Sequence, residues 1–69
     1  MPVVEIPELT PREIEVGRAL AKGMTYNQVA AELGISPHTV SMHTRMLRTK
    51  LKAENTVQVV NALNLRGLL

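Results

Sequence analysis

The sequence predicts an all-α domain of four helices, and three observations lead to this fold class. Helix-capping residues, each followed by apolar side chains at helical spacing, open segments at Thr10, Thr25, Ser36 and Asn55. No segment alternates apolar and polar residues for long enough to predict a strand, and the single aromatic residue, Tyr26, cannot fill a sheet core. A chain of 69 residues forms one small domain, so we expect a second subunit or another partner to complete its burial.

The first two helices are predicted from capping boxes. The stretch TPRE, starting at Thr10, combines an N-cap hydroxyl, a proline at the first helical position and a glutamate at the third, and the apolar stripe that follows runs to Gly23. Thr25 and Gln28 form a second box, and Gly34 ends a helix of about two turns. These two helices therefore have well-defined starts and ends in the sequence alone.

The third helix, predicted over residues 36–51, follows the second so closely that the two form a helix-turn-helix pattern. Ala30, Gly34 and Val40 have the expected spacing: the small residue lets the helices cross closely, the glycine permits a tight turn, and the β-branched residue fills the core below. The expected inward stripe is Val40, Leu47 and Leu51, with His43 or Thr44 as its fourth member. An ordinary αα-hairpin in a helical bundle shows the same pattern, so the outer surface of the helix has to distinguish the two.

The outward face of residues 36–51 has the chemistry of a nucleic-acid contact. The first 34 residues contain five glutamates against three cations, whereas the rest contain five cations against Glu54 alone, so the net charge of +2 is concentrated in the second half. The major groove of B-DNA accepts an α-helix, and we predict that Ser41, Met42 and Arg45 read base edges there. The expected contacts to the DNA backbone are Thr25, Tyr26, Asn27, Ser36, His38, Thr39, Thr44, Arg48, Thr49 and Lys52.

The fourth helix, predicted over residues 55–66, carries more apolar side chains than one core contact needs. Its predicted core stripe consists of Val59, Val60 and Leu63. A second stripe consists of Val57, Asn61 and Leu65. We expect this second stripe to be a dimer interface, because half-site binding by so small a domain is otherwise weak. The alternative is a set of scattered exposed apolar residues, which are common on small domains.

Several functional classes lack their sequence signals. The chain has no cysteine, which fits a reducing cytoplasm, and His43 has Leu47 at i+4 with His38 on a different face, so no metal or cofactor is expected. A Ser/His/Asp set and a glycine-rich phosphate loop are both absent from the sequence, so we expect no enzyme. Apolar runs are too short for a membrane span. Residues 1–9 are expected to be an extended arm, leaving residues 10–69 as the folded domain.

Five stretches together resemble the LuxR/GerE-type DNA-binding domain. They are LTPREIEV at residues 9–16, AKG at 21–23, QVAAELGISPHTVSMH at 28–43, LRTKL at 47–51 and the closing RGLL. This domain is the C-terminal output module of many bacterial response regulators and quorum-sensing receptors. The resemblance implies a four-helix domain that binds DNA as a dimer, often through its last helix, and regulates transcription. It also places Ser41, Met42 and Arg45 where the family reads bases.

The chain departs from the pattern of this family in four places. Gly17 stands where leucine is usual, Lys52 where glycine is usual, and His38 and Ser41 where lysine is frequent. Gly17 has two open explanations: another element packs closely against it, or it forms a notch for a partner. The sensor or receiver domain that usually precedes such a module is also missing, so we expect either a stand-alone regulator or an excised domain.

Sequence-specific binding of double-stranded DNA, with control of transcription, is the leading functional hypothesis. In this interpretation helix 36–51 enters the major groove, helix 55–66 forms a homodimer, and the protein acts in the cytoplasm at the bacterial nucleoid. The alternative is a small interaction protein that acts on another transcriptional regulator through helix 55–66 or through a surface at Gly17. A module similar to region four of sigma factors is a narrower third possibility.

Overall fold

The computed structural model describes residues 9–69, which form four helices and no strand, so the predicted all-α fold is confirmed. The helices are α1 (Pro11–Ala21), α2 (Tyr26–Leu33), α3 (Pro37–Leu51) and α4 (Thr56–Leu65). The arm predicted at residues 1–9 lies, apart from Leu9, outside the described residues. Leu9 itself is half-buried and packs against the core.

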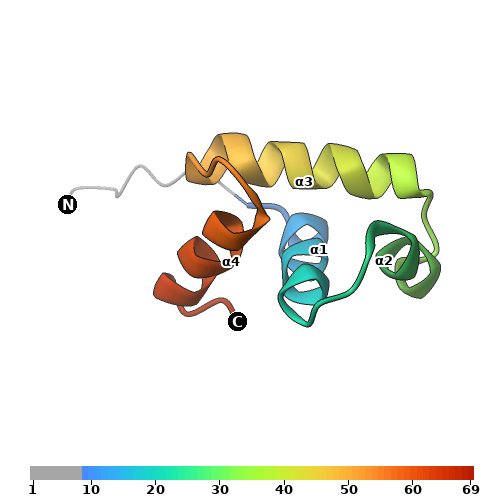
Figure 1. The fold of residues 1–69 in the computed structure, drawn as a ribbon, viewed down its shortest axis with the longest axis horizontal. Helices are drawn as coiled ribbons and strands as arrows, with labels where there is room; N and C mark the ends of the chain where they lie inside the picture. The colour runs from blue at the N-terminus through green and yellow to red at the C-terminus, as the bar shows by residue number, and fades with distance from the viewer. Residues whose placement is uncertain (1–8) are drawn as a thin grey trace.

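The longest helix, α3, lies across the other three. In Figure 1 it runs along one side of the molecule, with α4, α1 and α2 arranged in a row beneath it. It packs against each of them, and α1 in turn contacts α2 and α4. The hydrophobic core therefore lies where α1, the centre of the row, meets α3, and one long side of α3 remains free of other helices in the described part of the chain.

Every helix begins at the capping residue that the sequence predicts. The Thr10 and Thr25 hydroxyls accept hydrogen bonds from the third backbone N–H of their helices. In return, the side chains of Glu13 and Gln28 accept a hydrogen bond from the backbone N–H of the capping threonine. Ser36 caps α3 and Asn55 caps α4 in the same manner, without the returning bond. Each such cap contributes about 1 kcal/mol to helix stability.

The core consists of small and branched aliphatic side chains drawn from all four helices. The buried apolar residues are Val16, Ala19, Leu20, Val29, Ala30, Val40, Leu47, Val59 and Leu63. Val40 and Leu47 confirm the predicted inward stripe of α3, while Leu51 is only half-buried. A core without a single large aromatic residue requires close helix packing, because small side chains span only short distances between helix axes.

Gly17 lies where α1 packs against Leu63 of α4 and Leu47 of α3. It is buried, and a methyl group in its place would overlap Cδ1 of Leu63 and contact Cδ1 of Leu47. The first explanation of this glycine is thus correct, and the hypothesis of a partner surface at Gly17 is wrong, since Leu63 already covers it. Glycine at this position lowers the helix propensity of α1 but allows Leu63 to pack closely against the helix backbone.

Two left-handed residues set the directions in which the chain enters and leaves α3. Gly34 has φ 70° and ψ 33°, and the tight turn after it leads into the Ser36 cap, as the helix-turn-helix pattern requires. Lys52 ends α3 with φ 54° and ψ 43°, a conformation in which its Cβ crowds the backbone. Lys52 is the only residue other than glycine with positive φ in residues 9–69.

Candidate nucleic-acid interface

The free side of α3 presents long, flexible side chains and no acid. Met42, Arg45, Arg48 and Thr49 are exposed, with Met42 at 56% of its full accessibility, and Ser41 is half-buried beside them. None of the 15 residues of α3 is Asp or Glu. A solvated helix ordinarily mixes both signs of charge for i,i+4 pairing, so this one-sided composition is typical of a surface that meets a polyanion.

Met46, which was not among the residues predicted from the sequence, also lies on this free side. Its side chain is 44% exposed, one helical turn beyond Met42. The signal was available, because residues four apart share a helix face. Met42 and Met46 together give the exposed side of α3 an apolar strip of the kind that contacts thymine methyl groups.

Thr44, one of the predicted contacts to the DNA backbone, does not belong to this face. Only 2% of Thr44 is exposed, and its hydroxyl donates a hydrogen bond of 2.9 Å to the carbonyl oxygen of Val40. Thr44, rather than the half-buried His43, is therefore the fully buried fourth member of the inward stripe. Because the internal bond satisfies its buried hydroxyl, Thr44 is removed from the candidate contacts.

The N-terminal ends of α2 and α3 lie at the surface. Ser36 and His38 are exposed and Thr39 is half-buried; the Ser36 hydroxyl accepts from the Thr39 backbone N–H at 3.1 Å and lies 2.9 Å from the Thr39 hydroxyl. At the start of α2, the predicted backbone contacts Thr25, Tyr26 and Asn27 are all exposed. Both termini offer free N–H groups and the positive end of a helix dipole, which favour a phosphate.

The two basic residues at the end of α3 differ in their roles. Arg48 is exposed, and its Nη2 donates a hydrogen bond of 2.7 Å to the backbone carbonyl of Glu54 in the turn that follows. Lys52 is exposed and lies in that same turn. Arg48 thus supports the turn with one guanidinium nitrogen and has further N–H groups available for a ligand.

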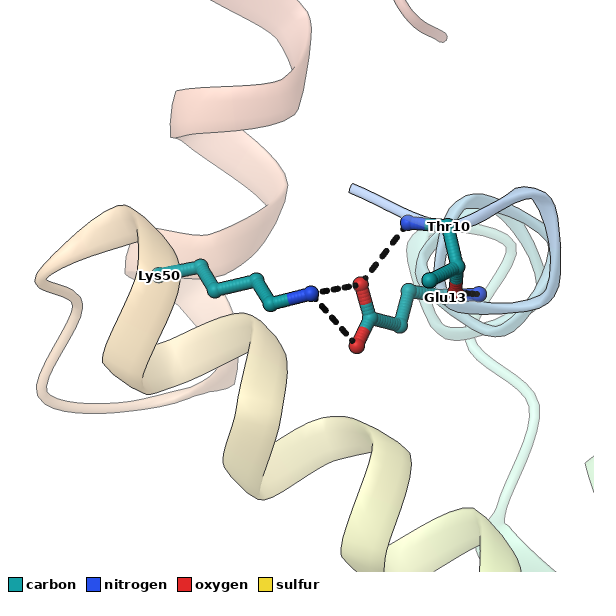
Figure 2. Close-up of polar contacts among 3 residues, drawn as sticks. All are labelled: Thr10, Glu13 and Lys50. Atoms are coloured by element: carbon teal, nitrogen blue, oxygen red, sulfur yellow. Dashed lines mark hydrogen bonds and ion pairs between the residues drawn. The ribbon is translucent and has the colours of Figure 1, made fainter. Parts of the chain in front are cut away.

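Lys50 points away from the exposed face and joins α3 to α1. Its Nζ lies 2.9 Å and 3.1 Å from the two carboxylate oxygens of Glu13, which also accepts from the Thr10 backbone N–H, as Figure 2 shows. Burial alone raises the pKa of Glu13, but the hydrogen bonds from Thr10 and Lys50 and the charge of Lys50 outweigh it and hold the pKa below its usual value. This ion pair fixes the C-terminal half of α3 against the start of α1.

On α4, the predicted dimer residues form an exposed apolar strip. Val57 is 68% exposed, Leu65 is 90% exposed, and Asn61 between them is also exposed. A hollow of about 430 Å³ is lined by Asn61, Leu65 and Asn64, and Asn64 was not among the predicted interface residues. The core stripe of the same helix is confirmed in Val59 and Leu63, which are fully buried, while Val60 is half-buried.

Metal and membrane sites have no support in the described residues. Residues 9–69 contain no group of three or more His, Asp or Glu side chains placed to hold a metal ion. Within that range, no helix is long and apolar enough to cross a bilayer.

The helix-turn-helix geometry and the acid-free side of α3 define a domain of the kind found in DNA-binding regulatory proteins. The family model described as bacterial regulatory proteins, luxR family, matches residues 7–63. The chain therefore belongs to the luxR family of bacterial regulatory proteins, as the five sequence stretches implied.

Regulators from several bacteria share this domain. The chain is 47% identical over 51 residues to the transcriptional regulatory protein UhpA of Escherichia coli (strain K12), covering 74% of this chain and 26% of that protein. It is 43% identical over 49 residues to the nitrate/nitrite response regulator protein NarP of the same strain, covering 71% of this chain and 23% of NarP. These relatives are regulators, so the prediction that the chain is not an enzyme is confirmed by family.

A solved response regulator has the same fold. The crystal structure of ChrA, from a heme-sensing two-component system, matches with a TM-score of 0.85 and 32% sequence identity, covering 100% of this chain and 33% of that one. The chain therefore spans about a quarter of the curated relatives and a third of this response regulator.

Proposed function

We propose that the chain is the sequence-specific, double-stranded DNA-binding domain of a transcription regulator and that it inserts α3 in the major groove. The exposed, acid-free side of α3 carries the proposal, because α2, α1 and α4 support the helix from the opposite side and leave that side accessible. Membership of the luxR family supports DNA as the partner. A bacterial protein with this partner acts at the nucleoid, in the cytoplasm.

In this proposal Ser41, Met42 and Arg45 read base edges. Arginine forks onto O6 and N7 of guanine, serine serves several bases, and methionine contacts a thymine methyl group. The phosphate contacts are assigned to the remaining exposed or half-buried candidates, namely Thr25, Tyr26, Asn27, Ser36, His38, Thr39, Arg48, Thr49 and Lys52.

Selection of bound duplexes from a random pool tests DNA binding directly. We expect enrichment of a palindromic site and an affinity that falls steeply with salt. Arg45→Ala should lose preference at particular base pairs, at a cost of about 1–3 kcal/mol there, whereas Arg48→Ala should weaken binding to all sequences about equally. A pool without enrichment, together with an affinity insensitive to salt, contradicts the proposal.

We further propose that the strip formed by Val57, Asn61 and Leu65 joins two copies of the domain. The exposure of two aliphatic side chains beside a hollow supports this, since a second copy would remove them from water. Two-fold pairing also matches the palindromic site expected above. The same apolar strip also favours a second candidate function, which is pairing with another transcriptional regulator. The subunit composition of the complex distinguishes this heterodimer from a homodimer.

A further inference from the structure

A basic hollow lies at the C-terminal end of the exposed side of α3. It has a volume of about 300 Å³ and is lined by Arg45, Arg48, Thr49 and Ala53. Arg48 and Thr49 supply guanidinium and hydroxyl donors, Arg45 adds a second positive charge, and no carboxylate lines the space. Such a lining suits a phosphate oxygen cluster, which accepts several charge-assisted hydrogen bonds from arginine.

The wall of this hollow is connected to α4 by a chain of hydrogen bonds. Arg48 Nη2 donates to the carbonyl oxygen of Glu54 at 2.7 Å, and the backbone N–H of Glu54 donates to Oε1 of Gln58 at 2.7 Å. Gln58 lies in the first turn of α4, where its own N–H donates to the Asn55 cap at 2.9 Å. The first turn of α4 therefore holds the peptide unit that holds Arg48.

The turn between α3 and α4 is closed from the other side as well. The backbone N–H of Ala53 donates to the Arg48 carbonyl oxygen at 2.8 Å, so both ends of Arg48 are tied to the same turn. A long arginine side chain loses conformational freedom when it binds a ligand, which lowers affinity about two- to tenfold. An arginine that is already held in place avoids much of this cost.

We propose that the hollow is a seat for one backbone phosphate of the bound duplex and that Gln58 is a positioning residue, which acts through the Glu54 peptide unit to hold Arg48 in that seat. This inference rests on the proposed DNA binding. It connects the helix assigned to dimerisation with a residue on the DNA face, across a turn of four residues from Lys52 to Asn55. The ligand is a phosphodiester; inorganic phosphate carries similar chemistry and is separated from it by the experiment.

A double-mutant cycle on duplex affinity tests the inference. We expect Arg48→Ala to weaken binding on the order of tenfold and to reduce the slope of log affinity against log salt by about one. Gln58→Ala should weaken binding about two- to tenfold in the wild-type background, the factor equivalent to ordering one long side chain. In the Arg48→Ala background, Gln58→Ala should change affinity less than about twofold.

Two controls separate positioning from a general loss of structure. Glu54→Gln removes the neighbouring negative charge but keeps the carbonyl oxygen, so it should not weaken binding. Gln58→Ala should lower the melting temperature in both backgrounds, because its bond to the Glu54 N–H is lost in each. Its effect on duplex affinity should depend on Arg48, and an equal loss of affinity in both backgrounds overturns the positioning role.

Replacing single phosphates of the selected duplex by neutral methylphosphonates tests the seat itself. At one position, the replacement should weaken duplex binding by the wild type but not by the Arg48→Ala variant. In a second experiment, inorganic phosphate is added and the NMR chemical shift of the Arg48 side chain is followed. If phosphate changes this shift but no methylphosphonate position affects duplex binding, the assignment of the hollow to a DNA phosphate is overturned. If the wild-type chain binds no duplex at all, the proposed function fails, whereas binding with an additive cycle refutes only this inference.

Discussion

The left-handed conformation of Lys52 allows stability and charge to be tested separately. A side chain with a Cβ costs about 1–2 kcal/mol in this backbone region, whereas glycine adopts it without that cost. Glycine also increases the entropy of the unfolded chain, which costs about 0.4–1 kcal/mol. We therefore expect Lys52→Gly to stabilise the domain by about 0.5–1 kcal/mol, which raises the melting temperature by roughly 2–8 °C in a domain of this size.

Lys52→Ala is the matched control for this substitution. It removes the same charge but keeps a Cβ at φ 54°, so we expect little change in melting temperature. If Lys52 contacts a phosphate, both variants should lose duplex affinity to the same extent, and the salt dependence should weaken by about one ion in each. Calorimetry and a salt titration measure the two effects. Equal melting temperatures for the glycine and alanine variants would refute the conformational argument.

The other predictions concern the Glu13–Lys50 ion pair, the packing at Gly17 and the exposed strip of α4. Glu13→Gln should cost about 1.5–3 kcal/mol in urea unfolding near neutral pH, against less than about 0.5 kcal/mol for the exposed Glu15→Gln. Because the folded-state pKa of Glu13 is lowered, its contribution is complete above the unfolded value of about 4.3 and disappears as the pH falls through the folded value; a Glu13→Gln difference that persists in acid would contradict this. Gly17→Ala should destabilise the wild type through its overlap with Leu63 but stabilise the Leu63→Val variant, which lacks Cδ1, by up to about 1 kcal/mol; equal effects in both backgrounds would exclude the close-packing account. Leu65→Asp should leave the monomer's unfolding free energy within about 0.5 kcal/mol but abolish self-association in sedimentation, and an unchanged dimer would remove α4 as the interface.

The features that could be predicted from the sequence depend on residues close together in the chain. Thr10 and Glu13 are three positions apart, so their capping box can be recognised without knowledge of the fold. The turn at Gly34 and the inward positions Val40 and Leu47 follow from spacing in the same way. Local hydrogen bonding and helical periodicity were therefore sufficient to predict four helices and the free side of α3.

The features that were missed depend on contacts distant in the chain or on the choice between neighbouring positions. Glu13 and Lys50 are 37 residues apart, and only the packing of α1 on α3 brings the two charges together. Thr44 and His43 are adjacent, and helical periodicity does not decide which of them is buried; a threonine has the advantage of bonding the carbonyl one turn earlier. Leu63 explains Gly17 only once α4 is seen against α1.

Because α3 rests on all three of its neighbours, it cannot tilt or slide without breaking the core that holds the whole domain together. A response to a signal then has to come from outside the domain. A partner can cover the exposed side of α3, or it can hold the α3 helices of two copies at a fixed separation. The domain thus keeps one conformation, and its DNA binding is controlled by whether α3 is accessible and by how many copies of the domain are brought together.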